Sequence, residues 1–285
     1  MKPAAFEYRR VTTVTEAVKL LRDAPDAKVI AGGQSLVPLM NFRLTRPSLL
    51  VDVNGIKALQ HVVWDGTFLR IGSLVRHQQI ADNVEIQKHC PVLTVAAKHI
   101  GHWAIRNRGT MGGSLAHADP ASEWPAAAVA LNAEIEVEGP QGVRMVPASE
   151  FYLGYYSTVL QPDELIVQIR IPSLKFRLGF AEMARRRGDF ALAGAYVEDD
   201  GNGQGFVTWF GVADKPVRVP TVLPGNLEAR REAWQQALGT LPIVDDKRSR
   251  IHLAVQIAER AWQHSQLEGA KYLSEEAIAG GDQPL

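Results

Sequence analysis

The hydrophobic pattern of the first 55 residues predicts a compact βαβ-like unit. Thr13 and Glu16 have the spacing of a capping box, which is typical of a helix start. The apolar residues that follow recur at helical intervals and share one face: Val14, Ala17, Val18 and Leu21. Short apolar runs at 28–31 and 49–53 predict buried strands. A Gly32-Gly33 turn therefore follows a strand directly.

In the middle of the chain, helical and strand-like patterns mix. Apolar runs predict strands at 67–72, 134–138, 143–146 and 165–171. A helical stripe follows Pro91, and a second helix is expected from Trp124 to Ala133. The stretch from Arg106 to Ser114 contains three glycines and is expected to be rich in turns.

The composition changes near residue 173, where we expect a domain boundary. Residues 173–189 are rich in lysine and arginine, and apolar runs at 193–198 and 206–212 then predict a hairpin. A last helix is expected over 246–266. Because helices and strands mix irregularly, the predicted fold class is α+β rather than a doubly wound parallel sheet.

Composition and charge narrow the possible functions. The 31 Lys and Arg residues balance the 31 Asp and Glu residues, so no global basic field attracts the chain to nucleic acid or to an anionic membrane. The single cysteine, Cys90, excludes an intrachain disulfide and a cysteine-ligated iron–sulfur site, and we expect it to be a buried, inert thiol. Because no signal peptide or membrane span is evident, we expect a soluble cytoplasmic protein.

Two glycine clusters are the most informative candidates for a binding site. Gly32-Gly33-Gln34-Ser35 and Thr110-Met111-Gly112-Gly113-Ser114 each place adjacent glycines in an expected turn. Backbone amides in such turns can hold anionic oxygens, and glycine allows close approach of a ligand. Two such clusters in one chain make a bound diphosphate a stronger candidate than one cluster would, with ordinary turns as the alternative, and neither cluster has the spacing of a Rossmann or Walker A loop. The glycines at 201–205 are interpreted as a hairpin loop.

Other candidates keep more than one interpretation. Asp119 and Glu123 either cap the helix that begins near Pro125 or accept hydrogen bonds from sugar-like hydroxyls. His99 and His102 lack a third ligand nearby, so ordinary histidines are favoured over a metal site. The arginines at 185–187 form either a solvated face or a surface for a partner or electron acceptor. For Phe190, core packing is favoured over contact with a planar cofactor ring.

Two motifs give the chain a family resemblance. Residues 31–36 (AGGQSL) and 106–120 (RNRGTMGGSLAHADP), in this order and about 75 residues apart, resemble the FAD-binding medium subunit of molybdenum hydroxylases, the carbon monoxide dehydrogenase and xanthine dehydrogenase group. The resemblance implies an FAD-binding fold of the PCMH or vanillyl-alcohol-oxidase type. It implies an N-terminal FAD-binding subdomain at 1–55, a second at 56–172, and a C-terminal domain at 173–285.

The resemblance also implies which residues bind FAD. Both glycine clusters would wrap the pyrophosphate, Glu123 would hold FAD hydroxyls beside Asp119, and Ile166 would meet the isoalloxazine ring through its backbone. Relative to the family, Gln34, Met111 and Ser114 replace the frequent His, Ile and Asn. The implied cofactor-binding residues are Ala31, Gly32, Gly33, Gln34, Ser35, Leu36, Ile100, Thr110, Gly112, Gly113, Ser114, Asp119, Glu123, Ile166 and Phe190.

The implied function is electron transfer. A large partner subunit with a molybdenum cofactor would hydroxylate the substrate, and a small partner subunit with [2Fe–2S] clusters would pass electrons to FAD in this chain, which then reduces an external acceptor. The assembly would be a heterotrimer or a dimer of heterotrimers. No catalytic acid–base pair, nucleophile or metal ligand set is expected in this chain, which agrees with a protein that positions a cofactor. Two alternatives are a self-sufficient flavin oxidoreductase of the same fold and a flavin-free scaffold.

Overall fold

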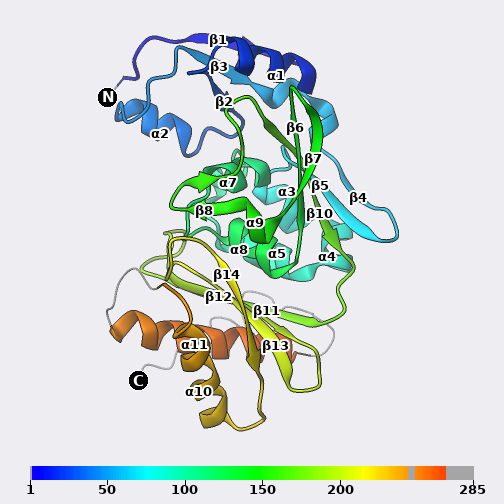
Figure 1. Cartoon of the computed structure of the whole chain (residues 1–285), viewed down its shortest axis with the longest axis vertical. Coiled ribbons are helices and arrows are strands. Elements are labelled where there is room, and N and C mark those ends of the chain that lie inside the picture. The colour runs from blue at the N-terminus through cyan, green and yellow to red at the C-terminus, as the bar shows by residue number, and fades with distance from the viewer. Residues whose placement is uncertain (1, 243–247, 268–285) are drawn as a thin grey trace.

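The computed structural model describes residues 2–242 and 248–267 and arranges three main sheets along the long axis of the molecule (Figure 1). A three-stranded sheet lies at the N-terminal end, a five-stranded sheet in the middle and a four-stranded sheet toward the C-terminal end. A small pair, β8 (Tyr152–Gly154) and β9 (Ser157–Thr158), completes the strands. The mixture of helices with largely antiparallel strands confirms the α+β class.

The N-terminal sheet is parallel, with β3 (Leu49–Asp52) between β1 (Glu7–Arg10) and β2 (Lys28–Ile30). Helix α1 (Val14–Asp23) begins as predicted, because Thr13 Oγ1 accepts a hydrogen bond from the Glu16 amide at 3.2 Å. The Glu16 carboxylate accepts from the Thr12 amide at 3.2 Å. Strand β1 was missed because its residues are all exposed, so no apolar alternation marks it.

The five-stranded sheet is antiparallel and has the order β4-β5-β10-β6-β7. The sequence predicted every strand of it except β4, whose side chains are only partly buried. The strands are β4 (Val62–Trp64), β5 (Phe68–Gly72), β6 (Glu134–Gly139), β7 (Gly142–Pro147) and β10 (Leu165–Pro172).

Short helices fill the space beside this sheet. They include α5, which follows Pro91 as predicted, and α8, whose residues are all buried. Cys90 is fully buried, and this burial raises the pKa of its thiol to about 12, so the expected inert thiol is confirmed. Helix α2 (Leu36–Asn41) lies at the N-terminal end of the molecule, near the three-stranded sheet (Figure 1). Two 3₁₀ turns, at Val53–Gly55 and Lys57–Leu59, connect the N-terminal sheet to the middle sheet. The helices of the middle region are α3 (His77–Asp82), α4 (Val84–His89), α5 (Pro91–His99), α6 (Trp103–Arg106), α7 (Met111–His117), α8 (Glu123–Ala130) and α9 (Ala148–Phe151).

The second glycine cluster lies in a helix and not in the turn that was predicted. Helix α7 starts at Met111, and Thr110 caps it by accepting a hydrogen bond from the Gly113 amide at 3.1 Å. Tertiary hydrogen bonds also hold this start, since the amides of Met111 and Gly112 donate to backbone oxygens of Val75 and Ser73 at 3.0 and 2.9 Å. Such bonds overcome the low helix propensity of glycine, which misled the sequence-based prediction.

The C-terminal region is a four-stranded antiparallel sheet with two helices. Its strands are β11 (Arg177–Ala184), β12 (Ala191–Asp199), β13 (Gln204–Phe210) and β14 (Val217–Val222), and its helices are α10 (Leu227–Leu238) and α11 (Arg248–Ser265). The predicted β12–β13 hairpin and the last helix are confirmed, although residues 246–247 of that prediction lie outside the described residues.

Both faces of this C-terminal sheet are covered. Helices α10 and α11 pack on one face, where a Cβ on Gly179 would lie 1.8 Å from the Ala261 oxygen. Phe180, Tyr196 and Phe210 on the other face join the core of the middle region. Helices α5 and α8 therefore contact the C-terminal sheet directly. Across the described residues, no helix is both long and apolar enough to cross a membrane.

Candidate functional site

The first glycine cluster forms an open loop between β2 and α2. Gly33 has φ of +71°, a left-handed conformation that favours glycine. Gln34 stays over the loop because its Nε2 donates to the Gly32 oxygen at 2.9 Å. Within the described residues, the backbone amides from Gly32 to Ser35 have no hydrogen-bond acceptor. These donors are available to an anionic group, as the sequence predicted.

Gly32 lies directly against the segment that leads into the second cluster. A Cβ at this position would lie 2.3 Å from the Arg108 oxygen and 2.7 Å from Gly109 Cα. Such distances are far below van der Waals contact, and both obstacles are backbone atoms that cannot rotate away. Glycine at position 32 therefore brings together two segments that are about 75 residues apart in the sequence.

The second cluster differs from the first in its available donors. The amides of Met111, Gly112 and Gly113 are all bonded within the protein, and the Ser114 amide donates to the Thr110 oxygen at 3.1 Å. The expected concavity of free amides is thus absent at 111–114. Gly112 serves packing, since its Cβ would lie 2.5 Å from Ser73 Cβ, whereas Gly113 is exposed. What this cluster offers a ligand is the exposed backbone of Gly113 and the Ser114 hydroxyl.

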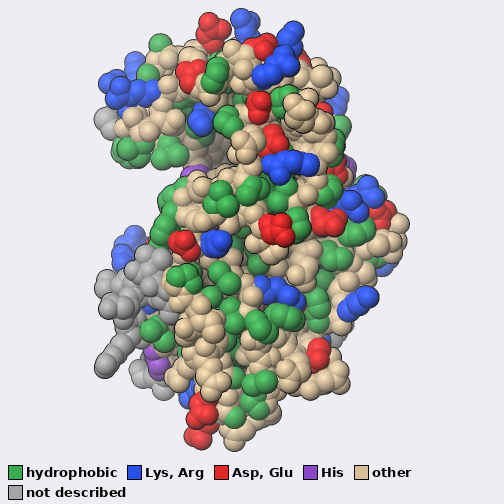
Figure 2. All heavy atoms as spheres, in the orientation of Figure 1, with side chains coloured by type: hydrophobic (Ala, Val, Ile, Leu, Met, Phe, Trp, Pro, Cys, Tyr) green, Lys and Arg blue, Asp and Glu red, His purple; other side chains and the backbone are tan. Residues whose placement is uncertain are grey.

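A cavity of about 480 Å³ lies beside the first loop. Its wall combines the loop with polar groups that the sequence analysis did not select: Tyr8, Asp52, Asn54 and Arg108. Tyr8 Oη donates to Asp52, and Arg76 supports the wall by donating to Asn54 Oδ1 at 2.5 Å and to the Arg108 oxygen. The surface is hollowed between the N-terminal sheet and the middle helices (Figure 2). Only Arg108 had a signal in the sequence, since it lies in the second motif.

A second cavity, of about 490 Å³, lies where the middle region meets the C-terminal sheet. Asp119 and Phe190 line it, together with Tyr155 and Tyr156. Phe190 is 62% exposed, so the preference for core packing was wrong. Asp119 is buried and held by the Ala121 amide at 2.9 Å and the Tyr156 hydroxyl at 3.3 Å, so its carboxylate stabilises a turn and does not cap α8.

Glu123 is the first residue of α8, and Ser122 occupies the N-cap position. The Glu123 side chain is buried, and among the described residues no other residue donates a hydrogen bond to its carboxyl group. Burial, followed by the negative charges of Glu182 and Asp119, raises the pKa of Glu123 well above its usual range. The prediction that the Glu123 side chain caps α8 is therefore wrong.

The two predicted isoleucines lie away from both cavities. Ile100 follows α5 and packs against the middle core. Ile166 is buried in β10, beside an irregularity in the pairing with β6. In that irregular stretch the Val167 oxygen accepts from the Ser73 amide at 2.9 Å, and Ser73 in turn supports Gly112. Ile166 is thus connected to the second glycine cluster through the backbone.

His77 is a buried support that the sequence analysis missed. Its Nδ1 accepts a hydrogen bond from Trp124 Nε1 at 2.9 Å, and a Cβ on Gly109 would lie 2.4 Å from its Nε2. Burial, with help from the charges of Arg76 and Arg106, lowers the pKa of His77 to about 3. The imidazole is therefore neutral in the folded protein and packs under the approach to the second cluster.

We expect His77 to make the fold sensitive to acid. Between pH 6.5 and about 3 the His77 imidazole is protonated in the unfolded chain and neutral in the folded chain. The free energy of unfolding therefore falls as the pH is lowered through this range. The maximum slope from this residue is about 1.4 kcal/mol per pH unit. Asparagine at position 77 retains an acceptor for Trp124 but cannot titrate. Urea unfolding at pH 6.5 and at about pH 3 should show a smaller decrease in the free energy of unfolding for His77→Asn than for the wild type. An equal decrease in both proteins would contradict this assignment.

Comparisons with known proteins agree with this geometry. Residues 4–174 match the family model described as the FAD binding domain in molybdopterin dehydrogenase. The chain is 45% identical over 198 residues to the alpha subunit of the 6-hydroxypseudooxynicotine dehydrogenase complex of Paenarthrobacter nicotinovorans, covering 68% of this chain and 67% of that one. It is 40% identical over 200 residues to the carbon monoxide dehydrogenase medium chain of Hydrogenophaga pseudoflava, covering 69% and 70%.

A solved structure extends the similarity to the C-terminal region. A chain of quinoline 2-oxidoreductase from Pseudomonas putida 86 superimposes with a TM-score of 0.87 at 34% identity, covering 95% of this chain and all of that chain. The chain belongs to the family of FAD-binding medium subunits of molybdenum hydroxylases, a family of oxidoreductases. The resemblance seen in the two motifs and the implied FAD-binding fold are thereby confirmed.

Proposed function

We propose that this chain binds FAD non-covalently across the two cavities. The observation that carries the proposal is the run of backbone amides from Gly32 to Ser35, which have no acceptor among the described residues, in a loop that lines a cavity together with Arg108. These donors suit a pyrophosphate, and Arg108 adds positive charge. The Asp119–Phe190 cavity, beside exposed aromatic side chains, suits the isoalloxazine end.

The remaining predicted residues have supporting positions in this proposal. Ala31 and Leu36 flank the donor loop, and Thr110 and Gly112 fix the second segment against it. Gly113 and Ser114 face the cofactor, Glu123 lies behind Asp119, and Ile100 and Ile166 support the core beneath the site. The FAD domain comprises 1–55 and 56–172, and the C-terminal domain comprises 173–285. Both the positions of the sheets and the family match at 4–174 support these boundaries.

The function of the chain is to carry electrons within a cytoplasmic molybdenum hydroxylase. Bound FAD supplies two-electron redox chemistry between [2Fe–2S] clusters of a small partner subunit and an external acceptor. A large partner subunit holds the molybdenum cofactor and the substrate. The names of the relatives as complex subunits and medium chains support this assignment. The chain's own residues bind and orient the cofactor and shield it from water.

The exposed arginines at 185–187 are the part of the chain that we assign to partner docking. They follow β11, which ends at Ala184, and precede Phe190, which lines the cavity assigned to the flavin ring. A turn that carries adjacent positive charges at this place favours a partner with an acidic surface.

Isolation of the chain from its native host tests this function. Gentle purification should bring down a large molybdenum-containing chain and a small cysteine-rich chain. The separated chain should keep FAD and oxidise no organic substrate, because electrons reach its flavin only from iron–sulfur clusters. Native material that is a metal-free homo-oligomer and still turns over substrate would establish the self-sufficient flavoenzyme instead. Purified complex without flavin would establish the scaffold.

A further inference from the structure

The peptide unit between Ala31 and Gly32 is held by a side chain from a different part of the N-terminal unit. Asn54 lies in the 3₁₀ turn that follows β3, and its Nδ2 donates a hydrogen bond to the Ala31 oxygen at 2.8 Å. In a planar trans peptide the C=O and N–H bonds point in opposite directions. The bond from Asn54 to the Ala31 oxygen therefore also fixes the direction of the Gly32 amide, which is the first free donor of the loop.

The contacts of Asn54 allow only one orientation of its amide group. Its Oδ1 accepts a hydrogen bond from Arg76 Nη2 at 2.5 Å, and its Nδ2 donates to Asp52 Oδ1 at 2.5 Å as well as to the Ala31 oxygen. A guanidinium group only donates, whereas carbonyl and carboxylate oxygens only accept. Turning the amide over would therefore oppose donor to donor and acceptor to acceptor, so Arg76 and Asp52 together fix the Asn54 side chain.

Arg76 contacts both walls of the cavity beside the loop through different nitrogens. Its Nη1 donates to the Arg108 oxygen, and its Nη2 donates to Asn54. The Arg108 oxygen is the atom that a Cβ on Gly32 would meet first, at 2.3 Å. A guanidinium group is planar and presents its donors in a fixed fork, so it binds two acceptors in set directions. One side chain thus fixes both the oxygen packed against Gly32 and the amide group that orients the Gly32 peptide.

The backbone of Arg76 is anchored to the segment that contains the second glycine cluster. The residues on either side of Arg76 form backbone hydrogen bonds with residues 109 and 111, at 3.1 and 3.0 Å. Arg76 itself is paired with Thr110 in an antiparallel bridge. Its side chain then reaches Asn54, which belongs to the N-terminal unit. The contact between Arg76 and Asn54 therefore joins the two parts of the chain that carry the glycine clusters.

The charged groups around this contact favour an anionic ligand. Burial, followed by the charge of Arg108, lowers the pKa of Arg76, and the charge of Asp52 acts in the opposite direction. Arg10 also lies close enough to Asp52 to lower the pKa of that carboxyl group. The Asp52 carboxylate thus lies among three guanidinium groups, and the resulting excess of positive charge suits a diphosphate.

We propose that Arg76 and Asn54 are positioning residues that direct the Gly32 amide to the diphosphate of the cofactor. The proposal rests on the proposed function. Arg76 fixes the Asn54 amide group, and Asn54 fixes the peptide unit whose N–H is the Gly32 donor. Each hydrogen bond in such a chain polarises the next, so the charge of Arg76 also strengthens this donor without contact with the ligand. Gln34 orients the following peptide in the same way, because its Nε2 donates to the Gly32 oxygen at 2.9 Å.

FAD affinity of the flavin-free full-length chain tests this arrangement. Arg76→Met and Asn54→Ala should each weaken FAD binding by about tenfold or more, because each removes hydrogen bonds that involve a charged group or the oriented peptide. The double variant should bind about as weakly as the weaker single variant, since both residues act through the same peptide. Arg144→Met is the matched control, because the Arg144 fork joins Glu164 and the Val159 oxygen and lines neither cavity. The control should bind FAD as the wild type does.

Arg76→Lys separates position from charge and keeps the test decisive if Arg76→Met does not fold. Lysine retains the positive charge but cannot reproduce the planar fork, so FAD binding should stay weaker than in the wild type by about threefold or more. Wild-type affinity in Arg76→Lys would show that charge alone matters and would overturn the positioning role. Losses that multiply in the double variant, or single variants that bind as the wild type, would overturn it as well.

The absorption spectrum of bound flavin distinguishes positioning at the diphosphate from general support of the fold. Neither Arg76 nor Asn54 lines the cavity of Asp119 and Phe190, which is assigned to the ring. At saturating FAD both single variants should therefore show wild-type flavin bands. Shifted bands in both would assign the two residues to the whole site and overturn a role confined to the diphosphate. A wild-type chain that binds no FAD would overturn the proposed function itself.

Discussion

Gly32→Ala is expected to abolish retention of FAD. The added methyl group would meet the Arg108 oxygen at 2.3 Å and would force apart the two segments that build the site. The Arg108 oxygen and the nearby Gly109 Cα are backbone atoms that cannot rotate away as a side chain can, so the loop itself has to move. The free amides from Gly32 to Ser35 then move with the loop. Valine at this position should be at least as severe. Gly113→Val is expected to act differently, by filling the exposed approach to the cofactor and crowding Thr110 Oγ1.

Flavin content after gel filtration measures this effect. Gly225→Ala is the matched control, because a Cβ there meets no atom within 4 Å. The control should retain wild-type FAD, and Gly32→Ala should elute as a folded, colourless protein. A Gly32→Ala variant with full flavin content would show that the close contact with Arg108 is not needed for binding.

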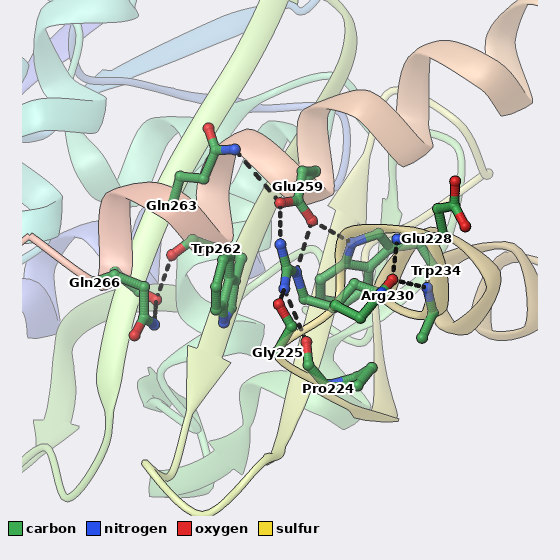
Figure 3. A network of polar contacts seen from close by, with 12 residues as sticks. Pro224, Gly225, Glu228, Arg230, Trp234, Glu259, Trp262, Gln263 and Gln266 are labelled. Atoms are coloured by element: carbon green, nitrogen blue, oxygen red, sulfur yellow. Dashed lines mark hydrogen bonds and ion pairs between the residues drawn. The ribbon is translucent and has the colours of Figure 1, made fainter.

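Arg230→Met is expected to cause the largest loss of stability in the C-terminal region. Figure 3 shows Arg230 of α10 in a forked ion pair with Glu259 of α11, at 2.9 and 2.6 Å. Arg230 also donates to the oxygens of Pro224 and Gly225, each at 2.8 Å, and lies over the Trp262 ring. Both side chains of the pair are less than a tenth exposed. Without the guanidinium, Glu259 would be a buried charge with no cation, which costs about 3–5 kcal/mol.

Urea unfolding of the full-length chain can measure this loss. Arg231→Met is a suitable control, since Arg231 is the exposed neighbour on the same helix. The Arg230→Met variant should unfold at a clearly lower urea concentration than either the wild type or the control. A double variant that also replaces Glu259 by methionine should recover part of the loss, because it removes the unpaired charge. Equal midpoints for all variants would show that the ion pair contributes little.

The fold could be predicted from the sequence where apolar periodicity is strong. Strands β5, β6, β7 and β10, the β12–β13 hairpin and helix α11 have continuous or regular apolar positions. Strands β1 and β11 were missed for a physical reason. β1 is an exposed edge strand, and β11 lies in the stretch 173–189, for which the sequence analysis noted only the abundance of lysine and arginine. Both strands form by pairing with a neighbouring strand, and the apolar periodicity of one segment carries no information about its neighbours.

The candidate site could be predicted only in part. The motifs located the glycine loops and the Asp119–Glu123 region, because glycine doublets and carboxylates leave a clear signal. They did not reveal which amides are free, since the hydrogen bonds from Met111 and Gly112 to the 73–75 segment depend on tertiary structure. Glu182 gave no signal at all. Its position beside His99 arises from the packing of the C-terminal sheet on α5.

The identity and amount of flavin in the purified chain test the central claim most directly. Acid precipitation of the protein should release stoichiometric FAD into solution, because the loop amides and Arg108 bind a pyrophosphate and no covalent attachment is proposed. The released flavin should have the chromatographic mobility of FAD. Recovery of FMN would contradict the pyrophosphate site at Gly32 to Ser35, flavin that stays with the precipitate would contradict non-covalent binding, and a flavin-free native complex would contradict the claim that this chain carries FAD.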